Sequence, residues 1–190
     1  MRRKKSKGEF GYMEAERRYV TLRTIILFII PLVIFIAGYL YHDYDSKNII
    51  TVVAVLGCLP ACKSMVNAIM FFRASGCSPA VREKIIEVAG EHTGCYDLYF
   101  TSYERNYPVS HMYLQGSLLC GYTEVKKCNC EAGEQHIAAM LKADGHKGIT
   151  VKIYRELSDY TACLKTLLGK ETETAEEKEV IYALLKNISL

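Results

Sequence analysis

The triplet Glu124-Val125-Lys126 carries the residue types of a metal-dependent hydrolytic site. On a central strand of a sheet, a carboxylate at the first position can hold Mg²⁺. An ammonium group two residues later can steady the water molecule that attacks the substrate. The triplet ends a stretch, residues 117–125, whose composition is typical of a β-strand. Glu124 and Lys126 are therefore the candidate catalytic residues.

The elements predicted around this triplet run helix, three strands, helix, strand. This order, with the Glu-x-Lys pattern, resembles the core of the restriction-endonuclease-like (PD-(D/E)XK) families over residues 79–155. The resemblance implies a Mg²⁺-dependent nuclease or a catalytically silent relative of one. The predicted strand 109–114 holds no acid for a second metal ligand, and Asp97 lies one strand earlier. We therefore keep nuclease-like function as the alternative interpretation.

A second candidate site is a zinc site at Cys128-x-Cys130, with His136 six residues later. Thiolate and imidazole are the usual zinc ligands, although structural sites favour two residues between paired cysteines. A fourth ligand would have to come from His92, His111 or His146. We favour the simpler interpretation, two loop cysteines without a metal, and the sequence leaves any cofactor unknown.

No recognised catalytic motif identifies a reaction. His111 and His136 have the chemistry of general bases, but no serine or cysteine stands at a spacing that marks a nucleophile, and no phosphate-binding glycine loop is present. Tyrosines are frequent between 96 and 122. They predict either a binding surface or a sheet packed against its helices. These residues are Tyr96, Tyr99, Tyr103, Tyr107, Tyr113 and Tyr122.

Two apolar stretches near the N-terminus determine where the remaining segments of the chain, including these candidate sites, are expected to lie. Residues 24–41 carry no charge, and residues 49–72 carry only Lys63. A helix rises about 1.5 Å per residue, so roughly 18 residues cross most of a hydrocarbon layer about 30 Å thick. The sequence predicts two transmembrane helices, about 24–41 and 49–70, forming a hairpin (24–72) with a short loop.

The second span has two features beyond its hydropathy. Gly57, Ala61, Ser64 and Ala68 recur every three or four residues, a spacing that lets helix backbones approach closely. Packing against the first span suffices to explain this face, and self-association is the alternative. Lys63 is interpreted as an interfacial anchor whose stem reaches water, with a pore-lining or pairing role as the alternative.

Charge predicts the orientation in the membrane. The first 23 residues carry eight Lys/Arg and three Asp/Glu, while the loop carries only Lys47 beside two acids. The positive-inside rule then places both termini in the cytosol of a multi-pass cell-membrane protein, where free thiols are expected. The basic tail, residues 1–23, is expected to contact anionic lipid headgroups, at about 1 kcal/mol per residue near the surface. The residues concerned are Arg2, Arg3, Lys4, Lys5 and Lys7.

Residues 78–190 predict a small α+β domain. Ser78-Pro79 is a helix start, because serine caps and proline is tolerated at the first helical position. Tyr96, Leu98 and Phe100 alternate on one face of the first strand. The expected order is a helix, a three-stranded meander, a helix, a strand and two helices. The strands are expected at 95–103, 109–114, 117–125 and 149–154, and the later helices at 132–144, from 158 and from 174.

The sequence thus predicts a membrane protein that presents a cytosolic α+β binding or regulatory domain and that self-associates through its hairpin. Residues 74–190 carry 13 Lys/Arg and 16 Asp/Glu, a net charge of −3, which is poorly suited to a phosphate backbone. We therefore expect no nucleic-acid partner and favour a non-enzymatic role. The alternatives are the nuclease-like domain and a small pore-forming effector.

Overall fold

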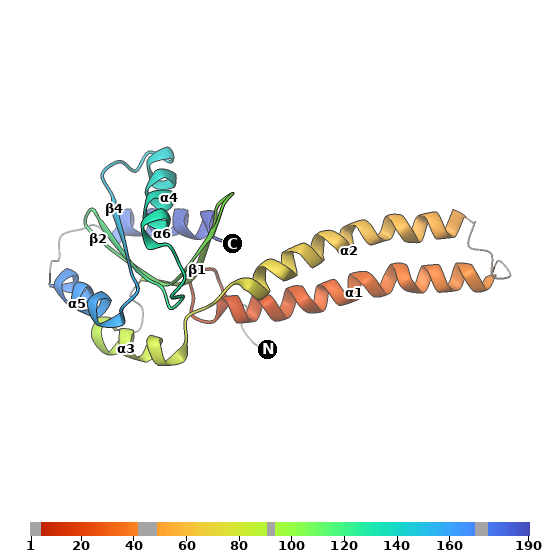
Figure 1. The fold of residues 1–190 in the computed structure, drawn as a ribbon, viewed down its shortest axis with the longest axis horizontal. Coiled ribbons are helices and arrows are strands. Elements are labelled where there is room, and N and C mark those ends of the chain that lie inside the picture. The colour runs from red at the N-terminus through yellow and green to blue at the C-terminus, as the bar shows by residue number, and fades with distance from the viewer. Residues whose placement is uncertain (1–4, 42–48, 91–93, 170–174) are drawn as a thin grey trace. The chain divides into compact units, whose positions relative to one another are not determined.

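The computed structural model describes residues 5–41, 49–90, 94–169 and 175–190, drawn as a ribbon in Figure 1. Over these ranges the chain is α+β, with six helices and a four-stranded mixed sheet. It divides into two compact units, residues 14–74 and residues 1–13 with 75–190. The predicted loop 42–48, the basic residues Arg2, Arg3 and Lys4, His92, and the predicted helix start at Thr174 lie outside the described residues.

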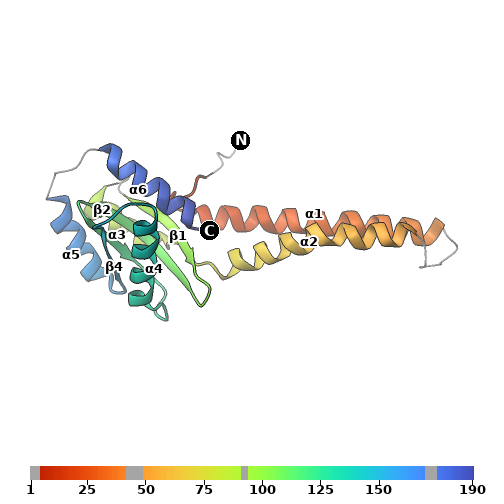
Figure 2. The same cartoon turned by 90° about the horizontal axis from the view of Figure 1, so that it is seen from above.

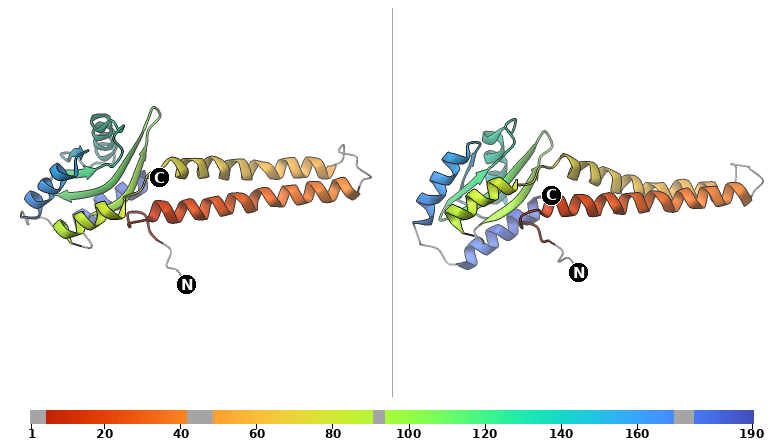
Figure 3. Two further views of the ribbon diagram at one scale, coloured as in Figure 1. Left: turned by 60° about the horizontal axis from the view of Figure 1, so that its bottom comes forward. Right: turned by 90° about the horizontal axis from the view of Figure 1, so that it is seen from below.

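Two long helices, α1 (Tyr12–Tyr41) and α2 (Ile49–Arg73), make up the first unit and lie side by side in both views of Figure 3. Both are long and apolar enough to cross a membrane. Their contact is close. A Cβ atom added to Gly57 would lie 3.2 Å from the Pro31 Cβ atom. Thr24 and Ser64 share a hydrogen bond of 2.8 Å between their hydroxyl groups. The small-residue face of α2 therefore packs on α1.

The exposure pattern of this helix pair is the reverse of that in a water-soluble protein. Small side chains such as Ala54 and Ala61 are buried between the helices. Large apolar side chains point outward; Val33, Val55 and Leu59 are 58%, 62% and 65% exposed. Water-soluble helices bury their large apolar residues and expose polar ones. The surface of α1 and α2 therefore consists largely of apolar side chains.

The first helix begins earlier than the sequence predicted. Residues up to 23 were expected to form a tail, but α1 starts at Tyr12 and carries Arg17 in its second turn. Arg17 donates to the carbonyl oxygens of Phe71 and Ala74, at 3.3 and 3.0 Å. The last carbonyls of a helix lack partners within the helix, so Arg17 caps the end of α2.

The second unit is built on a mixed sheet with the strand order β1-β2-β3-β4. Strands β1 (Cys95–Thr101), β2 (Asn106–Gln115) and β3 (Leu118–Tyr122) form the predicted antiparallel meander. Strand β4 (Thr150–Tyr154) then pairs parallel to β3. A parallel neighbour needs a crossover connection, and α4 (Cys130–Ala143) supplies it. The predicted order of elements is confirmed.

Helices cover both faces of this sheet, as Figures 1 and 2 show. Helices α4 and α6 (Ala175–Ile188) pack on one face, around Leu98, Met112 and Leu119. Helices α3 (Pro79–Ala89) and α5 (Leu157–Leu168) pack on the other, and tyrosines dominate that cluster. The result is a three-layer arrangement with a hydrophobic core on each side of the sheet.

The outer edge of β1 is occupied by the two ends of the chain. The Tyr96 amide donates to the Gly8 carbonyl, and the Leu190 amide donates to the Tyr99 carbonyl, both at 2.9 Å. The Lys7 ammonium donates to the Ser189 carbonyl at 2.9 Å. An uncovered edge strand can pair with another chain, so these contacts shield β1 over part of its length.

Every strand differs from the prediction in at least one boundary, and β2 and β3 differ most. The turn predicted at 104–108 is shorter, because β2 starts at Asn106 and includes Pro108. Strand β3 pairs only with His111–Gln115, so the missing N–H of Pro108 costs no hydrogen bond on that side. Strand β3 also ends at Tyr122 and not at residue 125, which leaves Glu124 and Lys126 beyond the strand.

The small-residue contact between α1 and α2 predicts a steric test. Ala61 is fully buried and the adjacent Cys62 is exposed. We expect Ala61→Leu to overpack the contact and to lower the free energy of unfolding by about 1–3 kcal/mol. Cys62→Leu, the same enlargement on the outer face, should change it little. Thermal unfolding followed by circular dichroism in detergent measures both, and equal effects would contradict this packing.

Candidate functional site

A buried carboxylate, Asp97 of β1, connects three parts of the second unit. Its Oδ1 atom accepts a hydrogen bond from the Cys77 amide at 2.6 Å, and its Oδ2 atom accepts one from the Met13 amide at 3.4 Å. The Gly11 backbone also hydrogen-bonds to it. Met13 lies in the first turn of α1 and is the last residue of this unit there, and Cys77 follows shortly after the chain leaves α2 at Arg73. Asp97 thus holds both connections against the sheet.

Space around this carboxylate is limited. A Cβ atom added to Gly76 would lie 3.1 Å from the Asp97 Oδ1 atom, so the connection after α2 passes directly over the carboxylate. Asp97 is only 2% exposed. Burial raises the pKa of the Asp97 carboxyl, while the backbone hydrogen bonds from Cys77, Met13 and Gly11 oppose that rise.

Asp97 also changes the direction in which β1 presents its side chains. It is the only non-glycine residue with a positive φ angle (54°) among the described residues, a conformation that aspartate tolerates better than most residues. Tyr96 packs with the α3–α5 cluster, whereas Leu98 and Phe100 pack with the α4–α6 cluster. The prediction that Tyr96, Leu98 and Phe100 share one face was therefore wrong, because alternation is reset at Asp97.

Next to Asp97 lies a buried aromatic group formed by Tyr96, His111 and Tyr160. The His111 Nδ1 atom is hydrogen-bonded to the Tyr160 hydroxyl, and the Tyr96 and His111 ring centroids are 4.3 Å apart. The Tyr96 hydroxyl is buried and has no hydrogen-bond partner among the described residues. Burial raises the pKa of Tyr96 to about 12 and that of Tyr160 well above its ordinary value. Both phenols stay protonated at neutral pH.

These groups do not form a nucleophile–base pair in the described structure. Cys77, whose amide donates to Asp97, has a buried side chain. Burial, followed by the charge of Glu124, raises the pKa of this thiol, so Cys77 remains protonated at neutral pH. His111 is fully buried and already bonded to Tyr160. The arrangement suits a rigid junction better than catalysis.

The candidate catalytic residues Glu124 and Lys126 lie beyond the end of β3 and not on a central strand as expected. The Glu124 carboxylate accepts a hydrogen bond from the Ser78 amide at 2.7 Å, at the N-terminal cap of α3. An acid at this position compensates the unpaired amides of the first helical turn. Lys126 is exposed in the turn after β3. Glu124 thus has a structural role in attaching α3 to the sheet.

The candidate zinc residues lie at the start of α4 and within it. Cys128 and Cys130 are buried, and the Arg155 guanidinium donates to the Cys130 Sγ atom at 3.3 Å. His136 packs its ring against Tyr107, with centroids 5.6 Å apart. Over the described ranges, no three His, Cys, Asp or Glu side chains gather as metal ligands would. The zinc site remains a prediction without geometric support.

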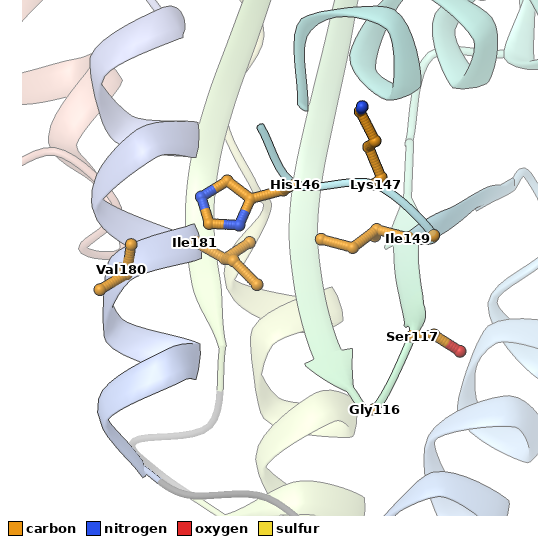
Figure 4. Close-up of a pocket in the computed structure, with 8 residues that line it drawn as sticks. Gly116, Ser117, His146, Lys147, Ile149, Val180 and Ile181 are labelled. Atoms are coloured by element: carbon orange, nitrogen blue, oxygen red, sulfur yellow. The ribbon is translucent and has the colours of Figure 1, made fainter. Parts of the chain in front are cut away.

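A cavity of about 480 Å³ opens at another edge of the sheet, between the β2–β3 turn, the loop before β4 and α6. Figure 4 shows the His146 imidazole beside Ile181 of α6. His146 also lies 4.0 Å from the Asp144 carboxylate. The remaining lining is formed by Gly116, Ser117, Lys147, Gly148, Ile149 and Val180.

The sequence patterns did not mark Asp97 as an organising residue, nor Tyr160 or Arg155 as residues of a site. A signal for Asp97 existed, because a lone acid inside an aromatic strand breaks the expected polarity of that strand. No comparable signal marks Tyr160, since a tyrosine on the apolar face of a helix is ordinary. No family model, no curated protein and no solved structure matches this chain.

Substitution of Asp97 should separate its two roles. Asp97→Ala leaves buried amides unpaired, at about 1–3 kcal/mol, and places a Cβ-bearing residue at positive φ, at about 1–2 kcal/mol. Asp97→Gly removes only the second cost, and Asp97→Asn retains one acceptor oxygen. We expect the loss of stability to rise from Asn to Gly to Ala. Circular dichroism measures the loss of stability of each variant. Tryptophan fluorescence cannot be used, because the chain has no Trp.

The exposed acid Glu104, in the turn after β1, provides the matched control for that series. Glu104→Ala should leave the free energy of unfolding nearly unchanged. If Asp97→Ala is as mild as Glu104→Ala, the carboxylate does not hold the two connections together.

The raised pKa of Asp97 predicts a pH dependence. The folded protein keeps this proton to a higher pH than the unfolded chain, whose value is near 3.8. The contribution of Asp97 to stability is therefore fully present below that value and is lost as pH rises through the folded-state pKa. Wild type should lose stability over this range relative to Asp97→Asn. Denaturant titrations at several pH values test this, and parallel curves would refute it.

Proposed function

We propose that this chain is a two-pass membrane protein whose helices α1 and α2 cross the bilayer and hold the α+β domain at its surface as a binding or regulatory module. One observation carries the proposal: α1 and α2 expose their large apolar side chains and bury small ones between them. Lipid is the solvent in which that pattern is stable. A soluble core helix would instead be covered by the protein.

Charge supports a cytosolic placement of the domain. The basic residues cluster before α1 and after α2, and the intervening loop has one Lys beside two acids. In the described structure Lys5 and Lys7 also donate to the carbonyl oxygens of Phe10 and Ser189. We propose that the N-terminal basic residues contact anionic lipid headgroups in addition to making these hydrogen bonds.

Self-association is proposed for the outer surface of the helix pair. The face with Gly57, Ala61, Ser64 and Ala68 is used between α1 and α2, so a second copy would meet the opposite surface. Lys63 is exposed on the pair. A pore-forming effector would place it toward a lumen, whereas a lipid-facing anchor would extend it to the headgroups. A strictly monomeric protein in detergent would speak against both self-association and a pore.

The nuclease-like alternative retains one supporting observation. The order of α3, three antiparallel strands, α4 and a parallel fourth strand agrees with the element order on which that resemblance rests. The position of Glu124 on the Ser78 amide argues for a catalytically silent domain. Mg²⁺-dependent cleavage of nucleic acid by the purified protein, lost in Glu124→Ala, would favour the alternative over a binding module.

The membrane proposal predicts resistance to alkaline extraction. Full-length protein should remain in the membrane pellet after carbonate treatment. A Val55→Asp/Leu59→Asp double variant should be released or degraded, because a charged residue at a span centre costs about 2.5–3.5 kcal/mol. Tyr103→Asp, a charge at a fully exposed domain position, is the control and should behave as wild type. Extraction of wild-type protein would overturn the proposal.

The orientation is tested separately with alkaline phosphatase fusions, which are active only outside the cytosol. A fusion inserted in the loop at residue 45 should be active, and one placed after residue 190 should be inactive. The opposite result would keep the protein in the membrane and invert its topology.

A further inference from the structure

Two cysteines that the proposed function does not use face each other between β3 and α5, on one side of the sheet. The Sγ atoms of Cys120 and Cys163 are 2.9 Å apart, although the residues are 43 positions apart in the chain. Cys120 lies in β3 and Cys163 lies in α5. A disulfide needs its sulfur atoms at about 2 Å, so a movement of roughly 1 Å would bring them together.

The surroundings give the two thiols different roles. Cys120 is fully buried, whereas Cys163 is partly exposed and reachable from solvent. The Tyr154 side chain hydrogen-bonds to Cys163. Burial raises the pKa of Cys120, so this thiol is a poor first nucleophile. Lys152 of β4, the strand partner of Cys120, opposes that rise with its positive charge.

We propose that Cys120 and Cys163 form a reversible disulfide that fastens α5 to β3 when the protein meets a small-molecule disulfide such as glutathione disulfide. In a reducing cytosol the thiols are free, and the bond forms only as the glutathione pool becomes oxidised. The close approach of the two thiols involves only the second structural unit, while the reducing surroundings that make the bond reversible rest on the proposed cytosolic placement.

The exchange proceeds in two balanced steps. The Cys163 thiolate attacks one sulfur of glutathione disulfide, forming a mixed disulfide and releasing one glutathione. The Cys120 thiol then loses its proton, its sulfur attacks the Cys163 sulfur, and the second glutathione leaves as a thiol. Two protein thiols are oxidised by two electrons in total, and one glutathione disulfide is reduced to two glutathione molecules.

A second pair of neighbouring thiols, Cys128 and Cys130, is less suited to this bond. Cys128 and Cys130 are separated by one residue at the start of α4, and the Cys130 sulfur accepts a hydrogen bond from Arg155. A bridge there would close a very small ring within one segment and fasten no two elements together. Cys120 and Cys163 join different layers of the domain, so their bond constrains how α5 lies on the sheet.

The test uses full-length protein in detergent, treated with glutathione disulfide, alkylated and digested with trypsin. Cleavage after Arg and Lys places Cys120 in peptide 106–126 and Cys163 in peptide 156–165. The expected result is a cross-linked pair of these two peptides that dithiothreitol separates. The oxidised protein should also melt at least about 5 °C higher than the reduced protein, because the bond closes a long loop.

Variants identify the order of events. Cys163→Ala should abolish the cross-link and leave Cys120 unmodified, since Cys120 is buried. Cys120→Ala should trap Cys163 as a glutathione mixed disulfide. Cys95→Ala, which removes another buried thiol on the opposite face of the sheet, should leave the cross-link intact.

Two outcomes would overturn the proposal. One is a wild-type protein that stays fully alkylated at Cys120 and Cys163 in excess glutathione disulfide. The other is Cys163 joined to a cysteine other than Cys120, within one chain or between chains. Both are read on the wild-type protein, so they hold even where an alanine variant fails to fold.

Discussion

The attachment of the Asp97 carboxylate to the chain at the start of α1 and after α2 is the constraint on which the domain depends. Here one carboxylate accepts amides from Met13 and Cys77. Those hydrogen bonds offset part of the cost of burying the carboxylate.

Several features follow from this carboxylate. The positive φ angle at Asp97 turns its side chain toward the two connections and resets which residues of β1 face each helix layer. Tyr96 consequently joins His111 and Tyr160 under α3 and α5, while Leu98 joins the opposite core. Glu124 plays a related part on the same side, because it fixes the start of α3 through the Ser78 amide.

Much of the fold could be predicted from the sequence, for identifiable reasons. The uncharged runs, the Ser78-Pro79 helix start and the alternating strands are local signals, and they gave the correct element order. The pairing of β4 beside β3 is non-local and left no such signal. The first helix was predicted to start too late, because Arg17 and Arg23 look like a tail until the carbonyls that Arg17 caps are known.

The candidate site was less accessible to sequence reasoning than the fold. Glu124 and Lys126 match a catalytic pattern in type and spacing, yet the strand ends before them and Glu124 meets a backbone amide. The residue type alone does not show whether a carboxylate already accepts a hydrogen bond from the protein backbone. Cys120 and Cys163 are likewise ordinary in sequence, and only the packing of α5 on β3 brings their sulfur atoms together.

The seating of both chain ends on β1 has a practical consequence for handling the protein. Ser189 and Leu190 bond to β1, and Gly8 bonds to it from the other terminus. Removing either end would uncover backbone donors and acceptors along an edge that is otherwise shielded. An edge uncovered in this way is able to pair with a strand of a neighbouring molecule, so fusion partners are better placed beyond a flexible linker that leaves these contacts intact.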